Sequence, residues 1–483
     1  MGVEVANSLR LKRGGGRPFP LDQFAKPRRR ASTDALLGMG LWVLLWLGYN
    51  TGPGRVMDPH FPANIADLIH GVRSYFPMLA AWFAVLMIFA RSTRLVSWIM
   101  GPLGLMLLYA VTGLVSSATL APDKTTALYY GANYLAIVLV LLAIVLVEDP
   151  LPDLRNVLKL TWSVGTILTL SLLAAIPILG SQVIIQTEGS PVGIRTYNGA
   201  GTIMGMASTR NTGFARYAAI SALVAIPGLM RRGKLTVRIM WGILLTVSLY
   251  ALIIANGRTE TLAFLGGVAV ILGAERAKRT VNLLVGIAAA ILLGLQGFYS
   301  TFYLYFTRTG QIDPTMTGRT VTWKEGWRLL WKSPWVGFGF QADRYYLGQH
   351  MHNAFLHVLI QSGLLGGAGI LIGLAIVWYY VIKYFFLHQP TDNSLIPPEI
   401  PAVFLFVTIS SVAESTFAYF SATWLLSAPI VAYVMALHRH LRRISVKVAQ
   451  GRGLRDRLAR RHSGGLGPPP EVLSSTAGGR LQD

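Results

Sequence analysis

The chain has 483 residues, of which 53% are hydrophobic and 13% are charged, and its formal net charge is +22. Recurring apolar runs of about twenty residues identify a polytopic membrane protein, and the basic residues lie in the tails and in short loops, which membrane topology and anionic lipid explain better than nucleic acid does. The absence of cysteine excludes disulfides, a thiolate nucleophile and a zinc–thiolate site.

Residues 1–34 form a basic tail that ends in Lys26, Arg28, Arg29 and Arg30. The tail is too long for the start of a signal peptide, and no small-residue cleavage site follows the apolar run at 35–49. We therefore interpret that run as an uncleaved first helix that follows a cytosolic tail.

The apolar runs predict an all-α fold of about 12 transmembrane helices. About nine are expected within 35–306 and about three within 353–437. The runs fall near 35–49, 75–90, 95–115, 127–147, 157–180, 213–230, 236–255, 259–273, 281–306, 353–382, 399–413 and 415–437.

Alternate loops carry an excess of lysine and arginine, as the positive-inside rule requires. The segments RSTR (91–94), RRGKLTVR (231–238) and ERAKR (275–279) share one predicted side with the tail 438–483. Both termini are therefore expected in the cytosol, and the arginine- and glycine-rich tail is expected to be disordered.

The longest loop, 307–352, is predicted on the outer side, and a loop of this length is usually functional. Within it, Trp323, Trp327 and Trp331 recur every four residues. This spacing places them on one face of a short helix, which we expect to lie flat on the outer membrane interface.

Several arginines lie on the side where the positive-inside rule predicts few. A single arginine there can reach lipid headgroups, but several guanidinium groups converging on one cavity would suit a substrate with a diphosphate. Arg216 lies inside an apolar run, where a bound anion or Glu260 would offset its cost, and Arg258 has the alternative of a structural bridge with Glu260 or Glu414. The group comprises Arg195, Arg210, Arg216, Arg258, Arg308, Arg319 and Arg344.

The stretch HMHN precedes the apolar run at 353–382. Asn353 suits an N-cap, whereas His352 can serve as a general base because free imidazole titrates near neutral pH. His350 and His352 have no obvious third ligand and there is no Asp-x-Asp pair, so no metal site is predicted. The GFGF of 337–340 lacks the context of a phosphate loop, and its glycines indicate a turn with close backbone approach.

The segment TGRTVTWKEGWRLLWKSPWVGFGF, followed by HNAFLHVLIQSGLLGG, resembles the signature region of the O-antigen ligase and polymerase superfamily. NGRTETLAFL is similar to the family's helix-end arginine, although Gly257 stands where serine is usual. The matching residues are Gly318, Arg319, Thr320, Trp323, Pro334, Gly337, Gly339, His352, Asn353, Leu356, Gly363 and Gly366.

The resemblance implies a fold similar to GT-C membrane glycosyltransferases and an active site at the outer, periplasmic face of the bacterial inner membrane. It implies transfer of a glycan from undecaprenyl diphosphate to a sugar hydroxyl, with no metal or other cofactor. We expect His352, Arg258 and Arg216 to be catalytic. We expect substrate binding by Arg210, Arg319, Asn353 and His350.

Three functions remain open from the sequence. A polymerase would use another lipid-linked repeat unit as the acceptor, and this is the interpretation that we adopt. An O-antigen ligase would use lipid A-core. A polysaccharide or lipid transporter would share the helix count, but transporters often show two similar halves, and no internal repeat is visible in this chain.

Overall fold

The computed structural model describes residues 33–49, 65–91, 95–179, 184–185, 209–231, 233–255, 257–274, 319–387 and 395–463. Over these ranges the regular structure is helical apart from a parallel pair of two-residue strands, β1 (Ile184–Ile185) and β2 (Thr209–Arg210). The helices are α2 (Thr33–Leu47), α4 (Ile65–Arg73), α5 (Phe76–Ala90), α6 (Leu95–Ile99), α7 (Pro102–Thr119), α8 (Lys124–Val145), α9 (Pro150–Leu179), α10 (Asn211–Met230), α11 (Leu235–Ala255), α12 (Arg258–Ala274), α15 (Arg319–Leu330), α16 (Ala342–Leu347), α17 (Ala354–Val381), η5 (Ile382–Leu387), α18 (Glu399–Ala413) and α19 (Ala422–Ser463).

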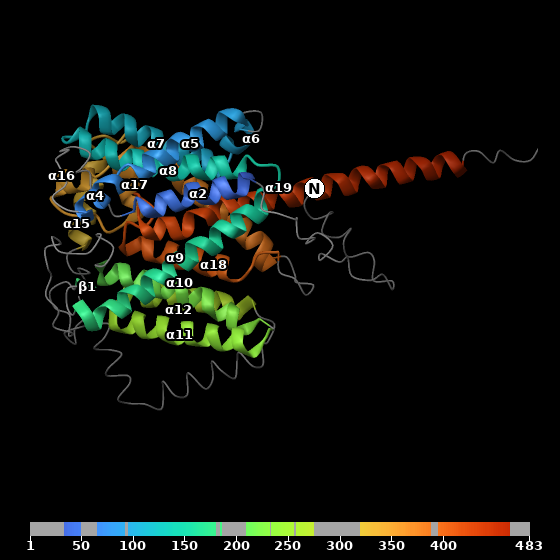
Figure 1. The fold of residues 1–483 in the computed structure, drawn as a ribbon. Coiled ribbons are helices and arrows are strands. Elements are labelled where there is room, and N and C mark those ends of the chain that lie inside the picture. The colour runs from blue at the N-terminus through green and yellow to red at the C-terminus, as the bar shows by residue number, and fades with distance from the viewer. Residues whose placement is uncertain are drawn as a thin grey trace, which may run out of the picture.

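The predicted class of fold, an all-α polytopic membrane protein, is confirmed. In the part of the chain that the structure describes, 7 helices are long and apolar enough to cross a membrane, and α2 and α18 are shorter apolar helices. Each predicted span that falls on described residues coincides with a helix, and the span 281–306 lies outside them. The helices run side by side as one bundle (Figure 1).

Three boundaries differ from the sequence prediction. The run 95–115 is divided into α6 and α7, because Gly101 and Pro102 end one helix and start the next. The run 415–437 becomes helical only at Ala422. The predicted disorder of 438–483 is wrong for 438–463, which continue α19, because arginine, leucine and alanine there favour helix and no proline interrupts them.

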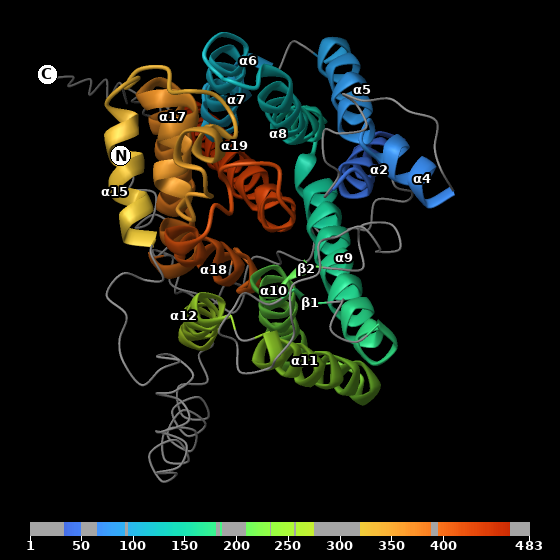
Figure 2. The ribbon, with the colours of Figure 1, turned by 90° about the vertical axis from the view of Figure 1, so that its left-hand side faces the viewer.

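The first part of α19 is the central helix of the bundle. Residues 422–437 are all buried, and Figure 2 shows this helix surrounded by α7, α8, α9, α17 and α18. A helix that is apolar on every side is stable only where other helices cover it. The segment that precedes α19, 414–421, is consequently held in the interior as well.

Helices α7 and α17 approach closely through small residues on α17. A Cβ atom at Gly366 would lie 1.9 Å from the Thr112 hydroxyl oxygen, and one at Gly373 would lie 3.3 Å from the carbonyl oxygen of Pro102. Such residues allow the backbones of membrane helices to pack tightly.

α17 is interrupted where the glycine turn meets it. Gly363, with φ 61° and ψ −165°, is not helical. Backbone groups of α17 beside it form hydrogen bonds with the turn: Phe338 N–H donates to Ile360 O at 2.8 Å, and Leu364 N–H donates to Pro334 O at 2.7 Å. Gly337 and Gly339 have φ of 71° and 89°. The predicted turn with close backbone approach is confirmed.

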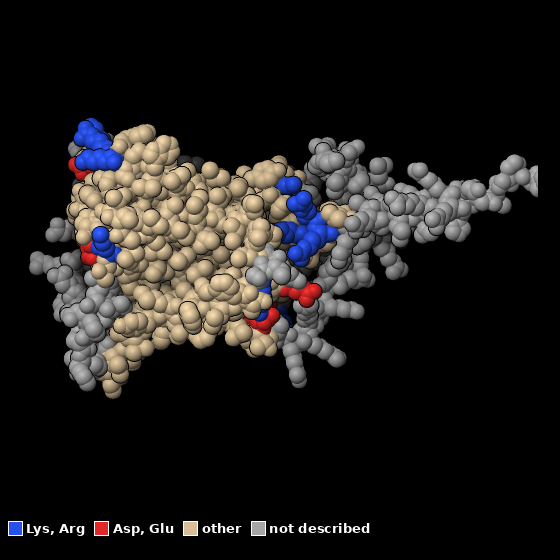
Figure 3. Space-filling model, turned by 90° about the horizontal axis from the view of Figure 1, so that it is seen from above, with Lys and Arg blue, Asp and Glu red and all other residues tan. Residues whose placement is uncertain are grey.

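Charged side chains gather at the two ends of the bundle. The face in Figure 3 shows lysine and arginine at both ends, with an uncharged band between them. Helix α15 lies across one end of the bundle (Figure 2), while α19 projects from the other end (Figure 1). The side chains of Trp327 on α15 and of Trp331 directly after it are exposed, whereas Trp323 Nε1 donates to Met351 O at 3.0 Å. The three tryptophans therefore do not share one environment.

Candidate active site

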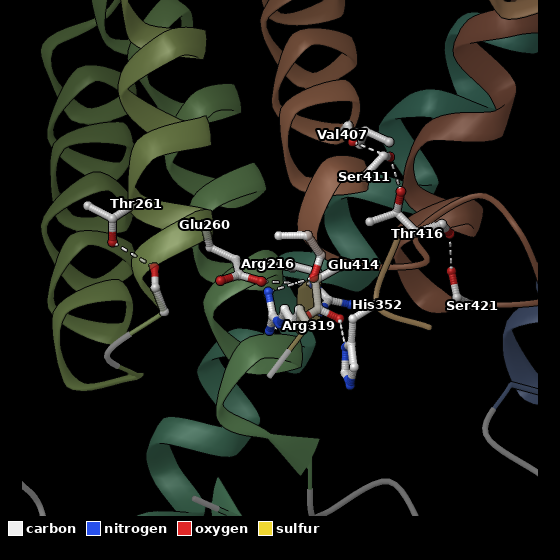
Figure 4. A network of polar contacts seen from close by, with 12 residues as sticks. Arg216, Glu260, Thr261, Arg319, His352, Val407, Ser411, Glu414, Thr416 and Ser421 are labelled. Atoms are coloured by element: carbon white, nitrogen blue, oxygen red, sulfur yellow. Dashed lines mark hydrogen bonds and ion pairs between the residues drawn. The ribbon is translucent and has the colours of Figure 1, made fainter. Parts of the chain in front are cut away.

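Residues from several segments meet around the side chain of Glu414 at the end of the bundle that α15 crosses (Figure 4). Arg216 comes from the first turns of α10, Glu260 from the start of α12, and Arg319 from the first position of α15. His352 lies two residues before α17. We call Arg216, Glu260, Arg319, His352 and Glu414 the Glu414 cluster.

Glu414 is placed by the end of α18 and by a short capped segment. Its own φ of −149° and ψ of 152° are extended and end α18. Hydroxyl groups hold the segment that follows: Ser421 Oγ donates to Thr416 O at 2.6 Å and accepts from Trp424 N–H at 3.1 Å, which caps α19. Short polar side chains thus stabilise a non-helical stretch inside the bundle.

The Glu414 carboxylate is the centre of the cluster. Its Oε2 lies 3.0 Å from Arg216 Nη2 and 3.2 Å from His352 Nδ1, and its Oε1 lies 3.3 Å from Arg319 Nη2. Burial alone would raise its pKa, but Arg216, His352 and Arg319 hold the pKa of this carboxyl well below its usual range. Glu414 is therefore ionised and accepts hydrogen bonds at neutral pH.

Arg216 is buried and paired with two carboxylates. In addition to Glu414, its Nε lies 3.2 Å from Glu260 Oε1, and Glu260 is 1% exposed. We expected Glu260 or a bound anion to offset the cost of burying Arg216, and Glu260 forms this ion pair. Arg216 thus bridges Glu260 and Glu414.

Arg258 is the first residue of α12, two positions before Glu260, and is partly exposed. Gly257 explains how Glu260 comes so close to α10, because a Cβ atom at Gly257 would lie 2.7 Å from Ala215 Cβ and 2.8 Å from Glu260 Oε2. A serine in place of Gly257 would not fit here without moving Glu260.

His352 combines a strained backbone with a defined ring orientation. Its φ of 49° is left-handed, which costs a non-glycine residue about 1–3 kcal/mol. Because an ionised carboxylate only accepts, the neutral ring carries its hydrogen on Nδ1, toward Glu414, and keeps a lone pair on Nε2. The side chain is 29% exposed.

The other predicted residues are distributed as follows. Arg319 joins the cluster and also donates from Nη1 to Ala413 O at 2.8 Å. Asn353 caps α17 by accepting from Leu356 N–H at 2.9 Å, as predicted. Arg210 lies in β2, and its side chain is outside the described part of the chain. Arg344 is exposed on α16, and Arg195 and Arg308 lie outside the described residues.

His350 faces away from Glu414 and toward a carboxylate that sequence reasoning missed. Its Nδ1 lies 2.9 Å from Asp343 Oδ2, and His357 Nε2 lies 3.1 Å from Asp343 Oδ1. Among the residues that the structure describes, these three each offer one donor atom within 4.8 Å of the others, a set that could hold a metal ion. The sequence offered no third metal ligand beside His350 and His352. The structure brings Asp343 to His350, but the set is completed by His357 and does not include His352. In the sequence, the three closely spaced histidines at 350, 352 and 357 were the feature that could have indicated this group.

Comparison with known proteins finds two sequence similarities. Residues 243–371 match the model of a family described as O-antigen ligase. The chain is also 34% identical to the exopolysaccharide production protein ExoQ of Rhizobium meliloti (strain 1021), over a stretch that covers 11% of this chain and 16% of the relative. The chain therefore matches only a small part of that relative's length. The family match contains Arg258, Glu260, Arg319 and His352, whereas Arg216 and Glu414 lie outside it.

Proposed function

We propose that the protein is a glycosyltransferase of surface polysaccharide assembly, because residues 243–371 match a family model described as O-antigen ligase. It moves a glycan from undecaprenyl diphosphate to a sugar hydroxyl. The observation that carries the proposal is the pairing of His352 with Glu414 where Arg216 and Arg319 converge on the same carboxylate (Figure 4). A base and cations within one cluster are what this reaction needs.

In the proposed reaction His352 is the general base. Its Nε2 takes the proton of the acceptor hydroxyl while the acceptor oxygen forms a bond to the anomeric carbon of the donor. The bond from that carbon to the diphosphate breaks, and undecaprenyl diphosphate leaves with the electron pair. Glu414 holds the ring orientation and stabilises the imidazolium that forms, as carboxylates do beside other catalytic histidines.

The charges in the cluster constrain how the diphosphate binds. Two arginines, Arg216 and Arg319, face two carboxylates, Glu260 and Glu414, so the described cluster carries no formal excess of positive charge. The diphosphate therefore recruits Arg258 from the start of α12 or displaces a carboxylate from Arg216. Arginine suits either role because its fork binds phosphate through two hydrogen bonds.

Replacement of His352 tests the proposal. Loss of a general base lowers the rate by about 10²- to 10⁴-fold, so we expect His352→Ala to abolish detectable glycan transfer in cells while the protein level in membranes is unchanged. The matched control is His440→Ala, on the part of α19 beyond the central segment, which should transfer glycan as the wild type does. Transfer by His352→Ala at the wild-type rate would refute the assignment.

An assay with purified protein separates an enzyme from a transporter. Supplied with a lipid-linked glycan and an acceptor, the proposed enzyme releases undecaprenyl diphosphate, and a transporter does not.

We place the protein with the polymerases because the relative is named for exopolysaccharide production. The ligase function is the second candidate, since the matching family is described as O-antigen ligase. Glycan length profiles from a deletion strain distinguish them. Loss of long chains with single attached units retained indicates polymerisation, whereas loss of all attached units indicates ligation.

A further inference from the structure

Beside the Glu414 cluster lies a second buried group of polar side chains. It consists of Asp343, His350, His357, Gln361 and Tyr109, and we call it the Asp343 network. Asp343, His357 and Gln361 are each 0% exposed. The ring centroids of His350 and His352 are 4.8 Å apart, so the two groups are adjacent.

Tyr109 and Gln361 connect the network to the interior of the bundle. The Tyr109 hydroxyl donates to Ala418 O at 2.6 Å and to the amide oxygen of Gln361. The amide nitrogen of Gln361 lies 2.7 Å from His357 Nε2 and donates to it, because an amide N–H only donates.

Asp343 accepts two hydrogen bonds at Oδ2. His350 Nδ1 and the backbone N–H of Met351 both lie 2.9 Å from this oxygen, while His357 Nε2 lies 3.1 Å from Oδ1. The Met351 N–H can only donate, so Oδ2 is held in a hydrogen-bonded support for the backbone.

The support acts directly on the residue before His352. The N–H of Met351 donates to Asp343, and its carbonyl accepts from Trp323 Nε1 at 3.0 Å. On the other side of His352, Asn353 is fixed as the cap of α17. His352 is consequently a single residue between two anchored ones, which explains how its left-handed backbone persists.

We propose that Asp343 is a positioning residue for glycan transfer, which holds 350–352 so that the His352 ring stays on Glu414. His350 serves in this arrangement as a hydrogen-bond donor to Asp343. In this proposal His350 supports the site, in place of the substrate binding expected from the sequence. The proposal rests on the proposed function, because it assigns a support to the base of that reaction.

Paired substitutions at His350 test the proposal. The amide of His350→Asn presents an N–H near the position of Nδ1, whereas His350→Ala has no donor. We expect His350→Asn to keep kcat within about threefold of the wild type. We expect His350→Ala and Asp343→Asn to lower kcat by about 10- to 100-fold with KM unchanged, which is the usual scale for lost support of a reacting group. The decrease of the transfer rate at low pH should persist in His350→Asn, because the proposed base His352 is unchanged.

The control is Tyr345→Phe, which removes a different tether of α16, the 2.6 Å hydrogen bond to Asp123, and should leave transfer unchanged. If Asp343→Asn does not fold, the comparison at His350 still decides. Equal loss in His350→Asn and His350→Ala, or no loss in either, would overturn the proposal. So would one tightly held zinc or cobalt per chain that His357→Ala removes, because the trio would then be metal ligands. If the wild type transfers no glycan, the proposed function fails instead.

Discussion

A buried guanidinium is stable when opposite charge surrounds it, and Arg216 has carboxylates on two sides. Removing one partner of a buried pair leaves an uncompensated charge and typically costs about 3–5 kcal/mol. Substitutions that remove the charge of Arg216, Glu260 or Glu414 should therefore lower the stability of the protein as well as its function. His350 and His352 are more informative for experiments because neither is a member of a permanently charged buried pair.

The pH dependence of stability should report on His350. Burial lowers the pKa of His350 to about 4, against the hydrogen bond with Asp343, which raises it. The imidazole pKa in the unfolded chain is about 6.5, so between these values the unfolded state binds more protons and acidification favours unfolding. The stabilisation is fully present above about pH 6.5 and amounts to about 3 kcal/mol, which is lost as the pH falls toward 4.

We therefore expect the thermal unfolding temperature of the purified protein to fall between about pH 6.5 and pH 4. His350→Asn, which has no titrating group at this position, should show a smaller fall, and unfolding followed at several pH values measures the difference. The same pH dependence in both proteins would contradict the assignment of His350 as a buried neutral ring.

Sequence reasoning identified single residues with unusual chemistry more readily than their partners. His352, Arg216 and Arg319 were recognised by type and position, and they do meet in the structure. Asp343 was missed because a single aspartate in a loop has no pattern that marks it as buried. Its partner His357 lies 14 positions away in the sequence and meets it only in the folded chain.

At the scale of elements, the interrupted helix α17 joins the turn of 334–339 to the active-site end of the bundle. The sequence predicted one continuous span at 353–382 and, separately, a glycine turn at 337–340. The structure contains both the span and the turn. The contact between them at Gly363 could not be predicted from periodicity, because a single glycine in a helical pattern is usually tolerated. The continuation of α19 was missed for a different reason, since its charge composition is also typical of disorder.

Two glycines of α17 should respond differently to alanine. A Cβ atom at Gly363 would lie 2.2 Å from the backbone of Trp335, and its φ and ψ belong to a region that only glycine adopts readily. At Gly369 the nearest atom would be 3.4 Å away, which is ordinary contact.

We expect Gly363→Ala to destabilise the protein by about 3 kcal/mol or more and to abolish transfer, and Gly369→Ala to behave as the wild type does. The amount of folded protein extracted from membranes, measured with glycan transfer, provides the comparison. Tolerance of alanine at Gly363 would show that the interruption of α17 is dispensable.

At the scale of the whole molecule, the uncharged band between the charged ends marks the part of the bundle that fits within a membrane (Figure 3). The spans were largely predictable because each apolar run is long enough to form a helix on its own. The arrangement around α19 was not predictable, since it depends on which helix is buried on all sides. The proposed orientation places α15 and the Glu414 cluster at the periplasmic face and the end of α19 in the cytosol.

Single cysteines can test this orientation without background, because the natural chain has none. Lys332 is exposed after α15, and Arg442 is exposed on the projecting part of α19. We expect Lys332→Cys to react with a membrane-impermeant maleimide in intact cells, and Arg442→Cys to react only after permeabilisation. The reverse pattern would place the candidate active site in the cytosol.

The two carboxylates on Arg216 have a consequence for selectivity among lipids. Any phosphate group that approaches this cation has to compete with acidic side chains already in contact. The phosphodiester of a phospholipid headgroup carries about one negative charge. A diphosphate carries about two in a compact array that matches several guanidinium forks. Under the proposed function, this competition should disfavour the abundant phospholipids of the surrounding bilayer relative to a polyprenyl diphosphate carrier.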